Sequence, residues 1–234
     1  MIFQAFKKTS LIEYPGKISS IVWTAGCTFN CPFCYNADLI NIQDKGSIQE
    51  QEILDHLSKN KHLIDALSLT GGEPTVHHDL PQFLEKVKKL GLLIQIETNG
   101  TNPVMLKQLI DKKLADYIAM DVKASLKWEK YSKIGGIKDK KLFENVKKSI
   151  KLIIDSKIDH EFRTTVIPKL HTKQDILDIA KSLKGAKAFY LQQFKNDVPL
   201  LNKELENTTQ FSRAELEEMW MSIKDNFKVC GVRS

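Results

Sequence analysis

Short apolar runs alternate with longer amphipathic stretches from one end of the chain to the other. The apolar runs are only a few residues long and are rich in β-branched side chains, which is typical of buried strands. They predict six strands, at residues 18–23, 66–70, 92–97, 117–122, 161–167 and 188–194.

In the amphipathic stretches, apolar residues recur every three or four positions, so that they gather on one face of a helix. This spacing predicts helices at residues 47–59, 80–90, 103–113, 142–156, 172–183 and 212–227. Three of them begin with a hydroxyl residue three positions before an acid, which is the spacing of a capping box: Ser47 and Glu50, Thr172 and Asp175, and Ser212 and Glu215.

Strands that alternate with helices predict βαβ units and therefore a parallel sheet. Right-handed crossovers curl such a sheet into an open barrel or a doubly wound sheet. The length of 234 residues suits a single α/β domain over residues 1–234, without a linker or a low-complexity tract. The first twenty residues are expected to add an extended segment that turns at residues 14–16.

The composition is that of an ordinary soluble chain, with 42% hydrophobic and 27% charged residues. No apolar run reaches the roughly 18 residues of a membrane span, and the N-terminus lacks the layout of a secretory signal. We therefore expect a cytoplasmic protein with no membrane contact. The net charge is +6, and part of it lies at residues 138–151, in either a solvated helix face or a docking face for an acidic partner. The basic stretch does not favour nucleic acid as a partner, because aromatic residues do not interleave its lysines.

Three of the four cysteines, Cys27, Cys31 and Cys34, lie within eight residues directly after the first predicted strand. Three thiolates can hold three irons of a [4Fe–4S] cluster and leave the fourth iron open for a ligand from outside the protein. A structural zinc site would need a second pair of cysteines or histidines, but no histidine lies between residues 1 and 55, and Cys230 is distant. A cluster with one open iron is therefore favoured over zinc and over cysteines that only pack.

Polar motifs stand at or near the C-terminal ends of the five later predicted strands. They are residues 70–74 (TGGEP), 97–100 (ETNG), 121–123 (DVK), 163–165 (RTT) and 192–194 (QQF). The C-terminal ends of parallel strands face one opening, where α/β enzymes build their active sites. These motifs and the cysteines are therefore expected around a common mouth.

Each motif also has a structural interpretation. Gly71 and Gly72 allow the backbone to approach a ligand, or they form an ordinary tight turn. Asp121 and Lys123 point to the same side of a strand, where they bind a ligand or pair with each other. Arg163 either holds a ligand carboxylate with two nitrogens or is a buried structural cation.

Two further polar positions are interpreted in the same way. Asn99 precedes a glycine, and it either contacts a ribose or forms a turn. His77 and His78 stand just before Asp79 and a predicted helix start, so that a surface capping region is expected for both. Cys230 is expected as a free cysteine in a C-terminal tail.

The spacing Cys-x3-Cys-x2-Cys, with the aromatic Phe33 just before the last cysteine, resembles the signature of the radical S-adenosylmethionine (radical SAM) enzymes. The resemblance implies an α/β fold, a partial (β/α)6 barrel of radical SAM type with a short extended N-terminal segment. It implies two cofactors: a [4Fe–4S] cluster on Cys27, Cys31 and Cys34, and S-adenosylmethionine bound at the open iron. Reduction of the sulfonium would release methionine and a 5′-deoxyadenosyl radical, which abstracts a hydrogen atom.

The same resemblance implies which residues bind S-adenosylmethionine. The Gly-Gly-Glu-Pro stretch resembles the motif that binds its amino group, and Asp-x-Lys pairs lie near the methionyl group in enzymes that activate glycyl radical proteins. The residues expected to bind the cofactor are Phe33, Tyr35, Gly71, Gly72, Glu73, Pro74, Asn99, Asp121, Lys123, Arg163, Thr165 and Gln193. Two positions depart from the family pattern: Tyr35 stands where many relatives have a histidine near the adenine, and Lys169 stands where glycine is common.

Within the superfamily, the chain is similar to the branch that activates anaerobic ribonucleoside-triphosphate reductase. After three cluster ligands only Cys230 remains, so that a second cluster has too few thiolates and branches with auxiliary clusters are excluded. The similarity rests on residues 8–17 (KTSLIEYPGK), 27–36, 71–74, 162–166 (FRTTV), 170–172 (LHT) and 191–194 (LQQF).

This similarity implies a reaction on a partner protein. A hydrogen atom would be removed from a glycine of a large anaerobic ribonucleotide reductase, with reduced flavodoxin or ferredoxin as the electron donor. We hypothesise that the N-terminal segment or residues 138–151 dock the reductase. Three alternatives stay open: activation of another glycyl radical enzyme, a carboxy-deazaguanine synthase-like enzyme acting on a small molecule, and a non-catalytic iron–sulfur electron carrier.

Overall fold

The computed structural model describes residues 1–42 and 46–233. Its eight strands form one open sheet in which each strand lies beside the one before it in the chain. The strands are β1 (Phe3–Ser10), β2 (Ser19–Thr24), β3 (Ala66–Gly71), β4 (Leu93–Thr98), β5 (Tyr117–Asp121), β6 (Asp159–Val166), β7 (Ala188–Gln193) and β8 (Val229–Arg233). β1 is antiparallel to β2, and all later pairs are parallel. This sequential order is that of a partial barrel, and it excludes the doubly wound alternative.

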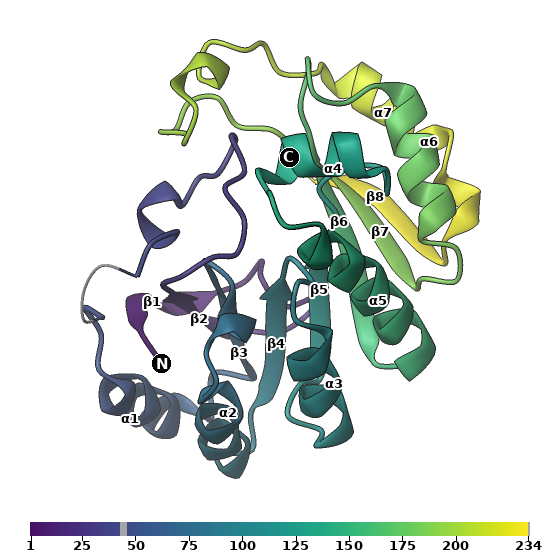
Figure 1. Cartoon of the computed structure of the whole chain (residues 1–234). Coiled ribbons are helices and arrows are strands. Elements are labelled where there is room, and N and C mark those ends of the chain that lie inside the picture. Colours follow the sequence, from purple (N-terminus) through teal and green to yellow (C-terminus); the bar gives the residue numbers. More distant parts are fainter. Residues whose placement is uncertain (43–45, 234) are drawn as a thin grey trace.

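Helices follow the parallel strands and lie along the outer side of the curved sheet (Figure 1). They are α1 (Glu50–Asn60), α2 (Leu80–Lys89), α3 (Pro103–Asp111), α4 (Trp128–Gly135), α5 (Lys140–Ser156), α6 (Lys173–Ser182) and α7 (Arg213–Met221). Because a helix returns the chain from the end of one strand to the start of the next, the C-terminal ends of β2 to β8 all face the same way.

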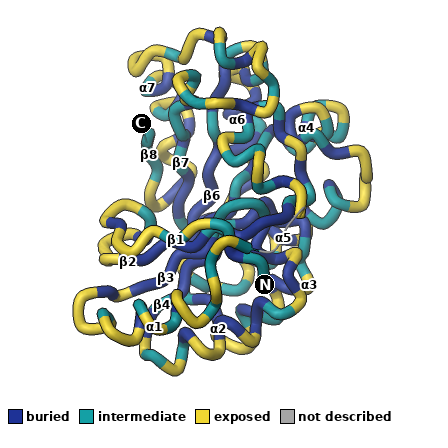
Figure 2. The backbone as a smooth tube through the Cα atoms, turned by 90° about the vertical axis from the view of Figure 1, so that its left-hand side faces the viewer, coloured by how far each residue is buried: buried dark blue, intermediate teal, exposed yellow. Residues whose placement is uncertain are grey.

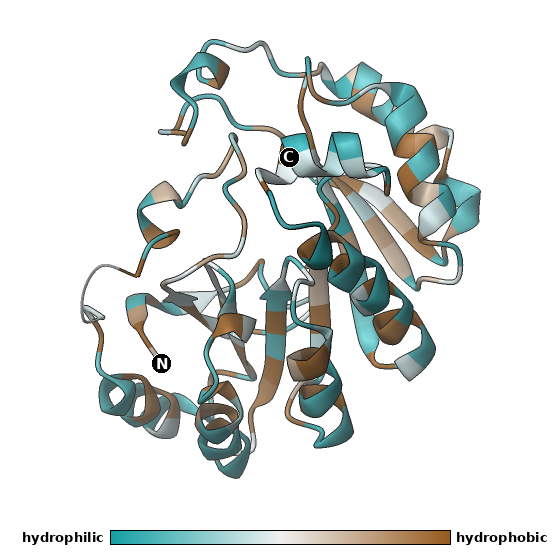
Figure 3. Ribbon diagram, in the orientation of Figure 1, coloured by the Kyte–Doolittle hydropathy of each residue, from teal (hydrophilic) through white to brown (hydrophobic). Residues whose placement is uncertain are grey.

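Alternation along the strands gives the sheet two different faces. On β4, Ile94 and Ile96 are fully buried on the helix side, while Gln95 and Glu97 lie together on the inner face. On β6, Phe162 is fully buried and the neighbouring Arg163 points inward. The strands are buried along most of their length (Figure 2) and carry polar bands between apolar ones (Figure 3). The apolar core therefore lies between sheet and helices, and the inner face is left for polar groups.

The sequence pattern located most of these elements. All six predicted strands are confirmed within two residues at each end, and each predicted helix has a counterpart. The capping boxes that open α6 and α7 are both present. The box predicted at Ser47 is wrong: α1 begins at Glu50 after Gln49, and the Ser47 hydroxyl donates to the Gln4 side chain at 2.9 Å.

Three elements were not predicted. The helix α4 was missed, the extended N-terminal segment contains the full strand β1, and the expected tail around Cys230 is the strand β8. The last predicted helix is also shorter than expected, because α7 ends at Met221. In the described residues, no helix is both long and apolar enough to cross a membrane.

The segment between β1 and β2 folds back under the sheet. Tyr14 is buried there against Tyr117 at the start of β5, with ring centroids 5.5 Å apart. The next residue toward β1, Glu13, reaches the cavity on the inner face. The N-terminal segment therefore closes one end of the partial barrel and contributes to the candidate site.

Candidate functional site

The cysteine loop is held to the rest of the structure by backbone hydrogen bonds. Gly26 and Cys27 donate to the carbonyls of Leu39 and Ile40, at 2.7 and 3.0 Å, which brings together the two ends of the loop. Within it, the Cys34 N–H donates to the Cys31 carbonyl at 3.0 Å. The positions of the thiols are therefore set by the backbone before any ligand is added.

The three thiols face one cavity of about 470 Å³ on the inner side of the sheet. Of the fifteen residues that the sequence predicted for the site, thirteen line this cavity: Cys27, Cys31, Phe33, Cys34, Tyr35, Gly71, Gly72, Asn99, Asp121, Lys123, Arg163, Thr165 and Gln193. Glu73 and Pro74 do not line it. The expectation that the strand-end motifs meet at a common mouth agrees with this geometry.

The donor set fits a multi-iron cluster. Burial is the main cause that raises the pKa of Cys27 to about 11 and that of Cys31 to about 12, so that iron must displace their protons. The Phe29 N–H and the Asn99 amide point at the Cys27 sulfur, at 3.4 and 3.7 Å. In the described residues, no three His, Cys, Asp or Glu side chains are gathered closely enough to hold a single metal ion.

The Gly-Gly-Glu-Pro turn packs directly on the start of the cysteine loop. Gly72 donates to the Thr24 carbonyl at 2.8 Å, and Glu73 donates to the Gly26 carbonyl at 2.7 Å. A Cβ added to Gly72 would lie 2.1 Å from the Gly26 oxygen, so that a side chain has no room. The glycines thus permit a close backbone contact, and they also line the cavity.

Glu73 is fully buried, and its carboxylate is used inside the protein. It accepts hydrogen bonds from the N–H and hydroxyl of Thr75, from the hydroxyl of Thr98 at 2.8 Å and from the Asn99 N–H at 2.6 Å. Pro74 is buried beside it and begins a short 3-10 turn. The side chain of Glu73 therefore ties the ends of β3 and β4 together, and it is not among the residues that line the cavity.

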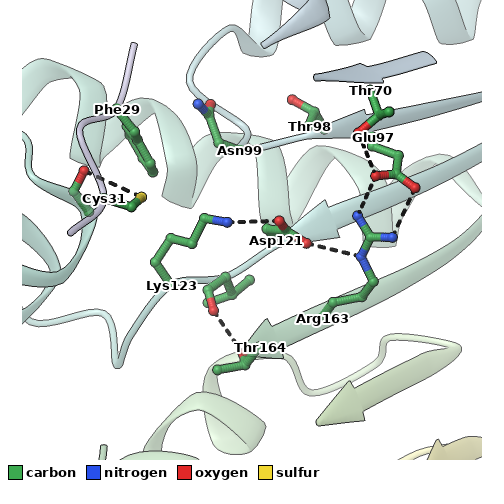
Figure 4. Close-up of polar contacts among 12 residues, drawn as sticks. Phe29, Cys31, Thr70, Glu97, Thr98, Asn99, Asp121, Lys123, Arg163 and Thr164 are labelled. Carbon is green, nitrogen blue, oxygen red and sulfur yellow. Dashed lines mark hydrogen bonds and ion pairs between the residues drawn. The ribbon is translucent and has the colours of Figure 1, made fainter. Parts of the chain in front are cut away.

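A network of buried charges forms another part of the wall (Figure 4). Arg163 donates from both terminal nitrogens to Glu97, at 3.0 Å each, and from Nε to Asp121 at 3.0 Å. The other oxygen of Asp121 accepts from Lys123 Nζ at 2.7 Å. Burial opposes ionisation of Asp121, but the two cations outweigh it and lower its pKa to about 2. The guanidinium is thus already held by two carboxylates of the protein.

A second ion pair on the inner face joins β8 to β6. Arg233 on β8 forms a bidentate pair with the buried Glu161, at 2.5 and 2.7 Å, and Tyr117 donates to the same carboxylate at 2.9 Å. The guanidinium stacks on the Tyr190 ring, 3.6 Å from its centroid. Arg233 lines the cavity, but it was not predicted, since it lies in the strand that was interpreted as a tail.

One carboxyl group of the cavity has no partner of this kind. Glu13 makes no hydrogen bond or ion pair to any described residue, although it lines the cavity beside charged groups. Burial, followed by the nearby Glu97, raises its pKa. Glu13 lies within residues 8–17, one of the segments on which the family resemblance rests, but no role was predicted for it.

Tyr35 connects the cysteine loop to the end of β7. Its hydroxyl accepts from the Lys195 N–H at 2.8 Å, and its ring stacks on Phe194 with centroids 6.5 Å apart. Phe33 is buried, and the Lys123 ammonium lies 5.8 Å from its ring centroid. Phe33 and Tyr35 therefore give the cavity an aromatic lining beside the cysteines.

The two histidines differ in their surroundings. His78 is exposed, as expected for a surface region, but His77 is buried and one of its ring nitrogens bonds to the Ala25 carbonyl at 2.8 Å. The surface assignment was therefore wrong for His77, which supports the backbone just before the cysteine loop. Four further cavity residues belong to the strand-end motifs that were expected at the mouth, although no role was assigned to them: Thr70, Glu97, Thr98 and Gln192. The remaining cavity residues were not singled out: Phe29, Asn36, Ile40 and Lys195.

Comparisons with known proteins agree with this geometry. The sequence profile described as the Radical SAM superfamily matches residues 21–183. A protein of Methanocaldococcus jannaschii, provisionally named as a glycyl-radical enzyme activating enzyme, is 35% identical over 80% of this chain and 77% of its own length. The 7-carboxy-7-deazaguanine synthase of Hyperthermus butylicus is 31% identical, but over only 38% of each chain.

The fold is also found among solved structures. SuiB of Streptococcus suis, solved with its precursor peptide SuiA, superposes with a TM-score of 0.71 at 15% identity. The match covers 90% of this chain and 47% of SuiB, so that the chain spans about half the length of that enzyme. At this level of identity the likeness concerns the fold.

Proposed function

The chain belongs to the radical SAM superfamily, whose members use a [4Fe–4S] cluster and S-adenosylmethionine, and we propose that it activates a glycyl radical enzyme, specifically an anaerobic ribonucleotide reductase. When bound, the reduced cluster supplies one electron that splits S-adenosylmethionine into methionine and a 5′-deoxyadenosyl radical, which takes a hydrogen atom from the substrate. The substrate would be a glycine of the partner, because its α-radical is stabilised by the flanking amides.

The observation that carries this proposal is the extent of the similarity to the Methanocaldococcus jannaschii relative. It covers 80% of this chain and 77% of the relative, and it is therefore not confined to the cysteine loop. The matches to 7-carboxy-7-deazaguanine synthases are shorter, with 38% of this chain covered for the enzyme of Hyperthermus butylicus and 60% for that of Clostridium acetobutylicum. The cavity supports the same reading, because three thiols and the strand-end motifs line it together.

Some residues of the cavity would bind the [4Fe–4S] cluster, and others would bind S-adenosylmethionine. Cys27, Cys31 and Cys34 would hold three irons as thiolates. The Asn99 amide would donate to the Cys27 sulfur, as it does in the protein alone. Hydrogen bonds to cluster sulfurs and burial are the means by which a protein tunes such a centre.

S-adenosylmethionine would lie between the cysteines and the charged wall. The backbone of Gly71 and Gly72 would hold its amino group, and Asp121 with Lys123 would lie near its carboxylate and sulfonium. Tyr35, Thr165 and Gln193 would complete the cofactor pocket on the side of the mouth. Arg163 would act indirectly, because it holds Glu97 and Asp121 in place.

A second function has a specific observation in its favour. Several relatives are 7-carboxy-7-deazaguanine synthases, and the unpaired Glu13 on the inner face would suit a small substrate with N–H donors. The shorter alignments to these relatives, and a cysteine loop that ends in Tyr35 and Asn36, make this the weaker of the two candidates.

The test uses anaerobically reconstituted protein, dithionite, S-adenosylmethionine and an anaerobic ribonucleotide reductase from the same genome. We expect 5′-deoxyadenosine together with a doublet in the electron paramagnetic resonance spectrum, from a glycyl radical on the reductase. The control is a reductase in which the target glycine is alanine, which should give no doublet. 5′-Deoxyadenosine without a glycyl radical on any such partner would contradict the proposal, and an intact cluster that never cleaves S-adenosylmethionine would favour an electron carrier.

A further inference from the structure

The positive charge of the chain is concentrated in one segment. Residues 127–148 contain eight lysines and three acidic residues, a net charge of +5, while the whole chain carries +6. The other residues therefore hold 27 basic and 26 acidic side chains and are close to neutral. A concentration of this kind creates a local field that attracts a partner of opposite charge.

This segment packs directly against the cysteine loop. The carbonyl of Gly135, at the end of α4, accepts from the Asn30 N–H at 3.1 Å and lies 3.6 Å from the Cys31 sulfur. A Cβ added to Gly136 would lie 2.0 Å from the Asn30 oxygen, so that the two backbones touch. Few atoms therefore separate this part of the surface from a predicted iron ligand.

Packed aromatic rings fill the space below this contact. The ring of Phe29, between two of the cysteines in sequence, lies 6.2 Å from that of Tyr131. Tyr131 lies 5.4 Å from Phe143, and Phe143 lies 5.8 Å from the half-buried Trp128. The route from the surface of α4 and α5 to the cysteines is thus continuous protein.

Four exposed lysines define what we call the basic corner: Lys133, Lys138, Lys140 and Lys141. None of them forms an ion pair with a described residue, unlike Lys127 and Lys130 nearby, which pair with acids of α6. Lys140 and Lys141 stand in the first turn of α5, which contains no acid. A cation at a helix N-terminus is opposed by the helix dipole, so that helix stability does not explain these two lysines.

We propose that the basic corner is the docking surface of a small acidic protein that delivers single electrons to the cluster. This inference rests on the proposed function, because that chemistry starts from a reduced cluster. In the transfer, one electron leaves the carrier, which is oxidised, and enters the cluster, whose charge falls from 2+ to 1+. Electron-transfer complexes are small and weak, and their association is accelerated by complementary charge.

The position of the corner separates it from the substrate. None of its four lysines lines the cavity, whose outer part is formed by residues such as Tyr35, Gln193 and Lys195. A carrier docked here would leave the mouth open for the protein that receives the radical. Of the two segments hypothesised to dock the reductase, this proposal assigns the basic stretch to the electron carrier and leaves the N-terminal segment for the reductase.

The experiment compares two charge reversals of equal size. Lys140→Glu/Lys141→Glu changes the corner, and Lys181→Glu/Lys184→Glu changes an exposed pair at the far end of α6 and just beyond it, on the opposite side from the mouth. Binding of an acidic flavodoxin is titrated, and the rate of cluster reduction by the reduced flavodoxin is measured in stopped flow without S-adenosylmethionine or reductase. These readouts do not depend on glycyl radical formation, so that they can fail independently of the proposed function.

We expect the corner variant to bind the flavodoxin at least about tenfold more weakly and to be reduced about tenfold more slowly at low salt. The gap should close at high ionic strength, where surface charges are screened, and reduction by dithionite should change less than twofold. The α6 variant should resemble the unmodified protein. Equal losses in both variants, or no loss in the corner variant, would overturn the proposal. A separate titration with the reductase covers the other occupant: weaker reductase binding by the corner variant, with flavodoxin reduction intact, would overturn the proposal and assign the corner to the reductase.

Discussion

Arg163 and Glu97 are joined by two parallel hydrogen bonds of 3.0 Å across the inner face of the sheet, between β6 and β4. The strand between them, β5, contributes Asp121 to the same guanidinium. Three neighbouring strands of the partial barrel are thus joined by ion pairs on the inner face of the sheet. This link shapes the wall on which the candidate cofactor site is built.

Removal of this cation should be costly. In Arg163→Met, Glu97 and Asp121 keep their charges in a buried place without their shared partner, and the free energy of unfolding should fall by about 3–5 kcal/mol. The control is Arg213→Met, because Arg213 pairs with Glu217 while its side chain is 87% exposed; the loss there should stay below about 1 kcal/mol. Urea denaturation measures both. Similar losses in the two variants would show that the buried ion pairs of Arg163 contribute no more to stability than an exposed pair.

The low pKa of Asp121 predicts a dependence of stability on pH. Its folded value of about 2 lies below the ordinary 3.8, so that its contribution is fully present above about pH 4 and is lost as the pH falls toward 2. The contribution is on the order of 2 kcal/mol. The difference in unfolding free energy between the unmodified protein and Asp121→Asn should therefore shrink between pH 5 and pH 2. A difference that stays constant over this range would contradict the assignment.

The sequence allowed most of the fold to be predicted, because apolar spacing and strand ends are local signals. The six parallel strands and the meeting of the cysteines with Asp121, Lys123 and Arg163 follow from alternation and strand direction alone. What could not be predicted depends on contacts between distant residues. The place of Arg233 in the cavity could not be predicted, because it depends on the pairing of β8 with β7.

At the Gly-Gly-Glu-Pro turn, the hydrogen bonds of Glu73 and the close contact of Gly72 could not be predicted for the same reason. The family resemblance implied that Glu73 and Pro74 bind the cofactor, but neither residue lines the cavity, and the carboxylate of Glu73 accepts hydrogen bonds from Thr98 and Asn99 at the next strand end. The role of Gly72 in contacting Gly26 likewise requires the position of a loop about fifty residues earlier. Sequence spacing shows that such residues share a mouth, but it does not show which of them the protein uses for itself.

The close contact of Gly72 predicts a severe effect of a single methyl group. In Gly72→Ala, the new Cβ would meet the backbone oxygen of Gly26 at 2.1 Å, and the turn must move away from the cysteine loop. The melting temperature and the iron content after reconstitution should both fall. Gly91→Ala is the control: a Cβ there has nothing within 4 Å, and the positive φ of 85° costs about 1–2 kcal/mol, while the cysteine loop is not touched. Full iron content in Gly72→Ala would contradict this role.

The four cysteines provide an internal comparison for the cluster. Cys31→Ala should reduce the iron content of the reconstituted protein far below four atoms per chain, because one of three proposed ligands is gone. Cys230→Ala removes a thiol that lies on β8 and does not line the cavity, so that its iron content should match the unmodified protein. Iron and sulfide analysis measures both. Loss of iron in Cys230→Ala would mean that this thiol is also a ligand.

The unpaired carboxyl of Glu13 predicts a residue that recognises the substrate. An acceptor without a partner among residues 1–42 and 46–233 is free to bind N–H donors, such as the amides on either side of a target glycine. Glu13→Gln keeps the size but removes the charge, so that KM for the partner should rise about tenfold, equivalent to about 1.4 kcal/mol, with the iron content unchanged. Since the pKa of Glu13 is raised, this contribution should grow as the pH rises through that value and the carboxylate forms. Glu52→Gln on the exposed side of α1 is the matched control and should leave KM unchanged. An equal KM in both variants would indicate that Glu13 lines the cavity without binding the partner.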